Sequence, residues 1–326
     1  MGIRAIVVLL VGFAFVSVHL AEAQQPKGPY KVGYLTPSSP SAVKDRQEVF
    51  RQGLRELGYV EGQNIVIEYR YADEKFDRLP KLAAELVRLK VDVIVAVGSP
   101  AINAAKNATR TIPIVMTGVP DPVAWGFIAS LDRPGGNITG LSLGGYELVG
   151  KRLELLKETV SRVSRVAFFW NPRSPGDLGL KEMQAAAQAS GLQIQSLEVG
   201  GRKYLESAFQ AAVKGRAGGL TVGSGPVFTS NRKQILDFAA KKRLPGMYPW
   251  RVYVEDGGLM SYAPNLSNGY RRVASYVDKI LKGRTPADLP VEQPMKFELV
   301  INLKAAKQIG LTIPPNILAR ADKVIK

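Results

Sequence analysis

Two turns of the sequence carry the residues best suited to hold a carboxylate. Each follows a run of strand-forming residues: one turn contains Gly98, Ser99 and Pro100, and the other contains Gly223 and Ser224. Serine is favoured at a helix N-cap and proline at the first helical position, so we expect a helix to begin at each turn. The exposed amide groups and positive end of a helix attract anions. These two turns therefore predict a site for a small carboxylate, with capping alone as the alternative role of the serines.

Further polar residues near predicted strand ends could complete such a site. Asp121, in the stretch VPDPV, is the candidate partner of an α-amino group, and Asp256 is its approximate counterpart later in the chain. Asp121 could instead cap only its own turn. The remaining candidates are turn or strand-end residues: Thr36, Pro37, Asn171 and Trp250. Tyr34, Trp170 and Tyr248 share the position of Trp250 near strand ends, where an aromatic ring could stack on a planar solute.

The composition excludes most catalytic chemistry. The 326 residues include no cysteine, and the one histidine is His19, close to the N-terminus. A Ser-His-Asp triad, a thiol nucleophile and the usual zinc sites therefore cannot form in the rest of the chain. No spaced cluster of acidic residues suggests a metal, so neither a metal nor a cofactor is predicted. Binding without catalysis is the favoured hypothesis, and an enzyme that uses Asp, Lys or Tyr remains an alternative.

The N-terminus predicts export. Arg4 precedes an apolar run, residues 5–18, which ends before Ala-Glu-Ala at 21–23. This order is typical of a secretory signal peptide, cleaved after about Ala23. The run is shorter than the roughly 20 residues that span a bilayer, which disfavours an uncleaved anchor. We expect a protein that diffuses freely in the periplasm.

The formal net charge of +16 raises the question of a nucleic-acid partner. The basic residues are scattered, and the short basic runs lie on predicted helix surfaces without interleaved aromatic residues. A solvated basic surface is therefore favoured, and no nucleic-acid partner is predicted.

Strands and helices alternate twice along the chain. The first pass has expected strands at 32–35, 65–69, 92–97, 112–117 and within 135–142, with helices around 50–57, at 79–87, after Pro100 and at 146–159. The second pass has expected strands at 166–170, 194–199, 219–224, 244–248 and within 257–262, with helices at 177–190, 205–213, 230–241 and 268–282. Such alternation is typical of parallel sheets covered by helices on both faces.

The two passes also match in their turns, at a spacing of about 130 residues. VGYLTP corresponds to FFWNP, AVGSP to TVGSGP, and GGNITGLS to GGLMSY. We infer one α/β domain present twice, with the carboxyl ends of both sheets facing a common cleft. In this interpretation LDRPGGNITGLS, residues 131–142, is the last strand of the first domain, which then leads across a hinge. It lacks the spacing of a phosphate-binding loop.

Several stretches resemble the bacterial ABC-transporter substrate-binding proteins of the tryptophan/tyrosine group, which are TrpX-like and have the type I periplasmic binding protein fold. The matching stretches are GSPAINAAKNAT and IPIVM within 98–116, DPVAWGFIASLDRPGGNITGLS at 121–142, GGLMSYAPN at 257–265, ILKGRTPADLPVEQP at 280–294 and FELVINLKAAKQIGLTIP at 297–314. The resemblance implies two Rossmann-like, doubly wound lobes joined by a three-crossing hinge. It also implies capture of a small amino-acid-like solute, possibly aromatic, for a permease in the inner membrane.

On this basis we expect lobe one to contain residues 28–142 and about 266–288, and lobe two to contain 143–265 and about 289–326. The protein is expected to be a monomer that closes around its solute. A subunit that presents a ligand to a membrane receptor would have the same fold and remains an alternative. A sugar-responsive repressor would need a helix-turn-helix before Tyr30, where the sequence has only the predicted signal peptide and a short linker.

Overall fold

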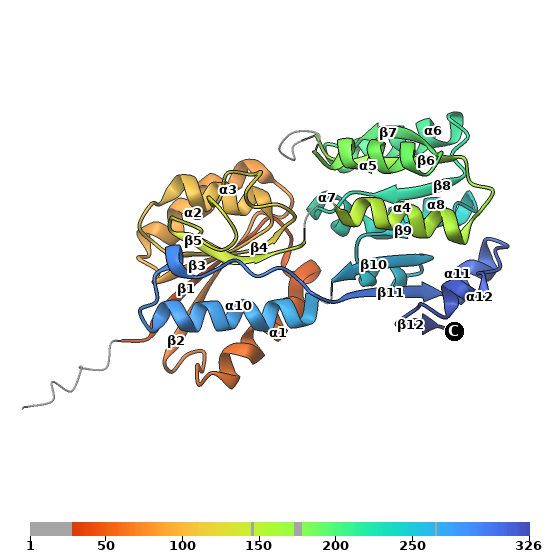
Figure 1. Cartoon of the computed structure of the whole chain (residues 1–326). Helices are drawn as coiled ribbons and strands as arrows, with labels where there is room; N and C mark the ends of the chain where they lie inside the picture. Colours follow the sequence, from red (N-terminus) through yellow and green to blue (C-terminus); the bar gives the residue numbers. More distant parts are fainter. Residues whose placement is uncertain (1–27, 145–146, 173–177, 265) are drawn as a thin grey trace, which may run out of the picture.

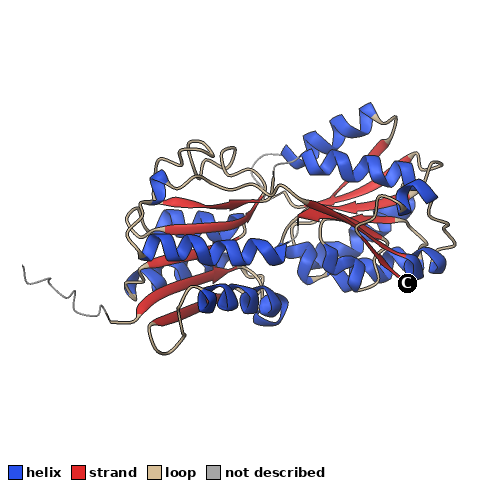
Figure 2. Ribbon diagram, turned by 60° about the horizontal axis from the view of Figure 1, so that its bottom comes forward, coloured by secondary structure: helices blue, strands red, loops and turns tan. Residues whose placement is uncertain are grey.

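The computed structural model describes residues 28–144, 147–172, 178–264 and 266–326. Two α/β lobes lie side by side in Figure 1, and Figure 2 shows the strands of each lobe enclosed by helices. The predicted signal peptide falls outside the described residues. None of the helices within the described ranges combines the length and the hydrophobicity that a bilayer crossing requires.

The first lobe contains a five-stranded parallel sheet in the order β2-β1-β3-β4-β5. Its strands are β1 Tyr30–Thr36, β2 Ile65–Tyr71, β3 Val93–Val97, β4 Ile114–Val119 and β5 Ile138–Ser142. The connecting helices are α1 Pro40–Glu56, the 3-10 turn η1 Phe76–Arg78, α2 Leu79–Arg88 and α3 Ser99–Ala108. Every residue of β3 is buried because helices cover both faces of the sheet.

The second lobe repeats this strand order as β7-β6-β8-β9-β10 and adds β11 and β12 beyond β10. Its strands are β6 Arg165–Trp170, β7 Gln193–Glu198, β8 Gly219–Val222, β9 Gly246–Tyr248, β10 Met260–Pro264, β11 Phe297–Asn302 and β12 Lys323–Ile325. The internal repeat is therefore confirmed, because β5 and β10, the strands of the two Gly-Gly stretches, hold the same place in their sheets.

The remaining helices belong to the second lobe or to its connections. They are α4 Glu147–Thr159, α5 Leu178–Ala189, η2 Arg202–Tyr204, α6 Leu205–Lys214, α7 Pro226–Ser230, α8 Arg232–Lys241, α9 Arg251–Glu255, α10 Leu266–Leu281, η3 Pro286–Asp288, α11 Leu303–Gln308 and α12 Pro315–Leu318. The predicted helix 230–241 is divided at Asn231, whose side-chain amide donates to the Val227 carbonyl at 2.8 Å.

The two parallel-sheet lobes are confirmed, and the second sheet adds one antiparallel pairing beyond its five parallel strands. β11 pairs antiparallel with β10, from Met260 opposite Ile301 to Pro264 opposite Phe297. The reason is the chain's route: β10 runs toward the other lobe, and β11 begins where the chain returns from it (Figure 1).

The chain crosses between the lobes three times. After β5, helix α4 packs on β9 and β10 of the second lobe, and after β10, helix α10 packs on α1 and β3–β5 of the first. The third crossing follows Glu292, whose backbone N–H and carbonyl bond to Gly140 and Ser142 of β5. Leu289 and Val291 are buried in the first lobe, so that lobe's last segment extends beyond residue 288.

Gly140 explains why LDRPGGNITGLS contains glycine within a strand. Its φ of +133° is one that L side chains rarely adopt, and a Cβ there would lie 2.2 Å from the Met116 carbonyl oxygen of β4. The stretch thus ends in β5, the last strand in the order of the first sheet, which is held against β4 by a close backbone approach that only glycine permits.

Candidate functional site

A cavity of about 590 Å³ lies between the lobes, at the carboxyl ends of both sheets. Thr36 is the last residue of β1 and Gly98 follows β3. From these two central strands the chain continues toward opposite edges of the first sheet. Asn171 and Gly223 hold the matching places after β6 and β8 in the second sheet. Ligands of doubly wound folds bind at such switch points, and the volume suits a small organic solute.

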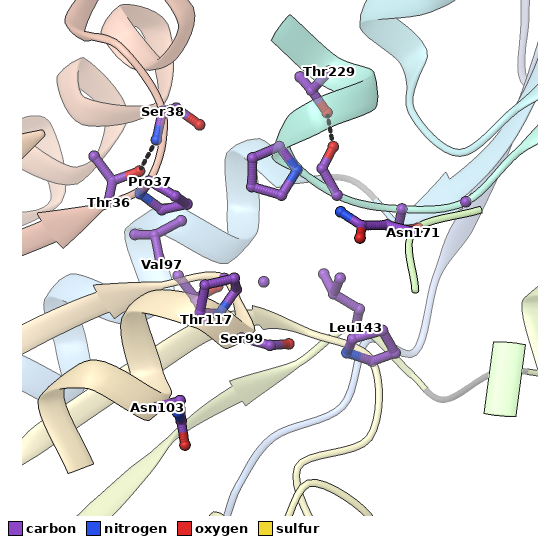
Figure 3. A pocket seen from close by; sticks show the side chains of 18 of the residues that line it. Thr36, Pro37, Ser38, Val97, Ser99, Asn103, Thr117, Leu143, Asn171 and Thr229 are labelled. Carbon is purple, nitrogen blue, oxygen red and sulfur yellow. Dashed lines mark hydrogen bonds between the residues drawn. The ribbon is translucent and has the colours of Figure 1, made fainter. Parts of the chain in front are cut away.

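The structure brings most of the sequence-predicted residues together on the cavity wall. These are Thr36, Pro37, Gly98, Ser99, Pro100, Asn171, Gly223, Ser224 and Trp250. In Figure 3 Ser99 of the first lobe and Asn171 of the second face the same space from opposite sides. Contact of these residues with a solute stays a prediction.

Asp121 and Asp256 do not line the cavity. The Asp121 carboxylate accepts the backbone N–H groups of Val123 and Ala124 at 3.0 and 2.9 Å, which is the turn-capping alternative. Asp256 forms an ion pair with Arg232 at 2.7 Å. The structure therefore does not place either carboxylate where an α-amino group in the cavity would need one. In both cases one carboxylate oxygen is held by a nearby group, the turn backbone for Asp121 and Arg232 for Asp256.

Ser99 and Ser224 lie near helix starts, but neither is the N-cap. The N-cap residues are Gly98, with φ +83°, and Gly225. The amides of Ala101 and Ile102 donate to the Gly98 carbonyl, and Pro100 has no N–H. The start of α3 therefore offers the amide and hydroxyl of Ser99 to the cavity, and this hydroxyl has no hydrogen-bond partner among the described residues.

The aromatic candidates divide into two groups. Tyr34 and Tyr248 are fully buried core residues: Tyr34 packs between Phe50 and Tyr69, and Tyr248 stacks on Tyr253 with ring centroids 5.1 Å apart. Trp170 and Trp250 do line the cavity. The structure adds aromatic wall residues that the sequence analysis missed, namely Phe76, Trp125, Phe168 and Tyr270. Six aromatic residues, from both lobes, thus belong to the described wall.

Sequence reasoning also missed two arginines on the wall, Arg46 of α1 and Arg152 of α4. Arg152 is only 5% exposed, and burial lowers the pKa of its guanidinium to about 10, so it remains charged at neutral pH. One signal was present: Arg152 is four residues after Leu148 and four before Leu156, both buried. Burying a charged side chain on the apolar face of a helix costs free energy, so this spacing in the sequence already indicated a residue with a role at a site.

The cavity wall offers hydrogen-bonding groups and rings, and nothing that suggests a metal centre. Over residues 28–144, 147–172, 178–264 and 266–326, no group of three His, Cys, Asp or Glu side chains is placed to hold a metal ion. The described wall thus combines small polar groups, aromatic rings and two cations. This arrangement can bind and desolvate a small organic molecule.

The lobes touch each other beside the cavity. Phe76, which lines the cavity, packs against the cores of both lobes. The side-chain amide of Asn231 in the second lobe donates to the Glu74 carboxylate of the first at 3.4 Å. These contacts and the three crossings hold the two lobes on either side of the cavity. A solute in the cavity could therefore contact both lobes at once.

Comparison with known proteins agrees with this geometry. The family model for ABC transporter substrate binding proteins matches residues 31–325. The chain belongs to this family. This ABC transporter substrate-binding protein is 26% identical to the tyrosine-binding protein of Clostridioides difficile over 263 residues, which cover 80% of this chain and 75% of that one.

Two solved structures share the fold of this substrate-binding protein. A conserved domain protein of Vibrio cholerae is 29% identical, with a TM-score of 0.85 and coverage of 90% of this chain and 99% of that one. An ABC domain of Streptococcus pneumoniae in complex with L-tryptophan is 24% identical, with a TM-score of 0.85 and coverage of 91% and 100%. Both likenesses support the two-lobed type I periplasmic binding fold.

Proposed function

We propose that this protein captures a small aromatic or amino-acid-like solute in the interlobe cavity and delivers it unchanged to the permease of an ABC importer in the inner membrane. The observation that carries the proposal is one cavity whose wall comes from the switch points of both sheets. The names of two similar proteins, which bind tyrosine and L-tryptophan, support an amino-acid-like or aromatic solute.

Lobe closure is the proposed mechanism. A solute that contacts Ser99 and Trp125 from lobe one and Trp170 and Asn171 from lobe two stabilises the conformation in which both walls reach it. Lobe one would comprise the first sheet with α10 and the segment to Glu292, and lobe two the second sheet with α4. The permease would recognise surfaces of both lobes at once, because only the closed form holds the two lobes in one fixed relative orientation.

The test begins with the solute that accompanies the purified protein. Denaturation followed by mass spectrometry should release a small aromatic or amino-acid-like compound. Returned to the stripped protein, this compound should raise the melting temperature by mass action, with a stabilisation of roughly 2.7 kcal/mol at a hundredfold excess over Kd. It should also reduce the radius of gyration in solution scattering.

Two outcomes would contradict the proposal. If the compound binds without reducing the radius of gyration, lobe closure is not the mechanism. If the protein converts the compound into a product, the protein is an enzyme. The periplasmic location has its own measurement: N-terminal sequencing of the exported protein is expected to begin at about Gln24, after the proposed signal peptide.

A further inference from the structure

Arg152 is a buried cation for which the described chain supplies no counter-charge. Its Nε donates to the Tyr262 carbonyl at 2.8 Å and its Nη2 to the Pro249 carbonyl at 3.5 Å. No described carboxylate forms an ion pair with it, and Nη1 has no partner among the described groups. A guanidinium has five N–H donors, so several remain for a ligand.

Arg152 is one of the residues that line the cavity, although its side chain is nine-tenths or more buried. A buried charge without a partner is costly, and a carboxylate accepts two parallel hydrogen bonds from a guanidinium. The two carbonyls that hold Nε and Nη2 fix the orientation of this group before any ligand arrives.

Other donors on the wall lack partners as well. The indole N–H groups of Trp125 and Trp170 are buried and make no hydrogen bond in the described part of the chain. Arg46, on the wall of the first lobe, makes no hydrogen bond or ion pair with the described residues. The indole nitrogens themselves are covered, so the donors that remain for a ligand are those of the two arginines, one from each lobe, and neither arginine can accept a hydrogen bond.

Acidic groups, by contrast, are missing from the described wall. None of the described residues that line the cavity is an aspartate or a glutamate. Asp121 caps its own turn and Asp256 pairs with Arg232, as shown above. An ammonium group entering this wall would meet two cations and no described carboxylate, which disfavours it electrostatically.

We propose that the solute is an aromatic carboxylate without an ammonium group, and that Arg152 binds its carboxylate. This inference rests on the proposed function and narrows its solute class. The aromatic part would lie among Phe76, Trp125, Phe168 and Trp250, and the carboxylate would neutralise the buried guanidinium. Arg46 of the opposite lobe adds attraction that favours closure around an anion.

Matched ligands test the charge preference without any mutation. The probes are three sets that keep one ring each: 3-phenylpropionate, L-phenylalanine and phenethylamine; 4-hydroxyphenylpropionate, L-tyrosine and tyramine; indole-3-propionate, L-tryptophan and tryptamine. Calorimetry on the stripped wild-type protein is expected to give at least roughly tenfold tighter binding of an acid than of its amino acid, and no binding of the amine.

The result separates this inference from the proposed function. An amino acid that binds tighter than its matched acid would overturn the inference and leave solute capture intact. Failure of all nine compounds to bind would overturn both the inference and the aromatic class, while a different solute released from the purified protein would still support capture.

Two variants test the assignment to Arg152. Arg152→Gln is expected to weaken the best acid by roughly a hundredfold, because a charge-assisted bidentate contact is lost. Lys151→Gln is the matched control, since Lys151 is the neighbouring cation on α4 and pairs with Glu154 at the surface. Unchanged acid affinity in folded Arg152→Gln would overturn the assignment, and the wild-type ligand series decides the charge preference even if that variant does not fold.

Discussion

The two lobes share one strand order and differ in the helix that each receives across the hinge. In lobe one, α10 packs through buried Tyr270, Val273 and Val277. It also buries Asp278, which accepts a hydrogen bond from Tyr59 at 3.0 Å and pairs with Lys282. In lobe two, α4 packs through Leu148, Leu153 and Leu156 but also buries Arg152 beside the cavity. Each crossing helix therefore buries one charged residue. Asp278 of α10 has a hydrogen-bond donor and a counter-charge within its own lobe, whereas Arg152 of α4 lies at the cavity with no counter-charge among the described residues.

This difference shows that two lobes with the same strand order can place different side chains at the cavity. The order 2-1-3-4-5 follows from strands alternating with helices, which both halves retain. The side chains at the cavity are under no such constraint, because one polar residue on a crossing helix leaves the strand order unaltered. The four predictions below, from the largest expected effect to the smallest, test how far the lobes differ.

The edge strand of lobe one should be the least tolerant of change. Gly140→Ala is expected to lower the free energy of unfolding by about 3 kcal/mol, because its Cβ would overlap the Met116 carbonyl of β4 and its φ is unfavourable for alanine. Denaturant unfolding measures this effect. Gly136→Ala in the preceding turn is the control, since a Cβ there meets nothing within 4 Å. Equal stability of the two variants would show that β4 and β5 can separate.

The buried charge of lobe two should reduce the stability of the ligand-free protein. Arg152→Met is expected to raise the free energy of unfolding by about 1 kcal/mol, because removing a desolvated charge outweighs the loss of two hydrogen bonds to carbonyls. Lys151→Met, at the surface of the same helix, should change it by less than about 0.5 kcal/mol. A clear loss of stability in Arg152→Met would mean that the two carbonyl hydrogen bonds of Arg152 stabilise lobe two by more than its desolvation destabilises it.

The turn of lobe one should contribute a single neutral hydrogen bond to the solute. Ser99→Ala is expected to weaken solute binding by about 1 kcal/mol, because its hydroxyl lies on the wall without a partner among the described groups. Calorimetry with the solute released from the wild-type protein measures this. Ser130→Ala, whose hydroxyl bonds only to Arg133 in an exposed turn, is the control. If both variants bind equally well, Ser99 has no role in the site.

The smallest effect should be that of pH near neutrality. Burial lowers the pKa of Arg152 to about 10 and a bound carboxylate would raise it, so binding takes up a proton only above that value. Affinity for an aromatic acid should be constant from about pH 6 to 9, fall at higher pH as free Arg152 deprotonates, and fall near pH 4 as the ligand is protonated. Calorimetry across this pH range measures the affinity, and circular dichroism verifies that the protein stays folded. A steady decline of affinity between pH 6 and 9 would contradict the prediction.

Much of this protein was predictable from the sequence. Apolar runs of strand length alternate with helical periodicity, and the matching turns AVGSP and TVGSGP recur in both halves, so the doubled α/β fold and the carboxyl-edge cleft followed from local patterns. Residues such as Ser99 and Asn171 come directly after strands, and a parallel sheet carries every such residue to one edge. Their place on the wall is therefore a consequence of chain order.

Tertiary structure alone decided the rest. Asp121 and Tyr34 also lie near strand ends, yet the Asp121 side chain bonds to its own turn and the Tyr34 ring lies in the core, because side-chain direction depends on neighbours distant in sequence. Arg46 and Arg152 lie within helices, where periodicity shows which face is buried but not what that face meets. Only the packing of α4 across the hinge, against β9 and β10 of the second lobe, brings a buried guanidinium to the cavity.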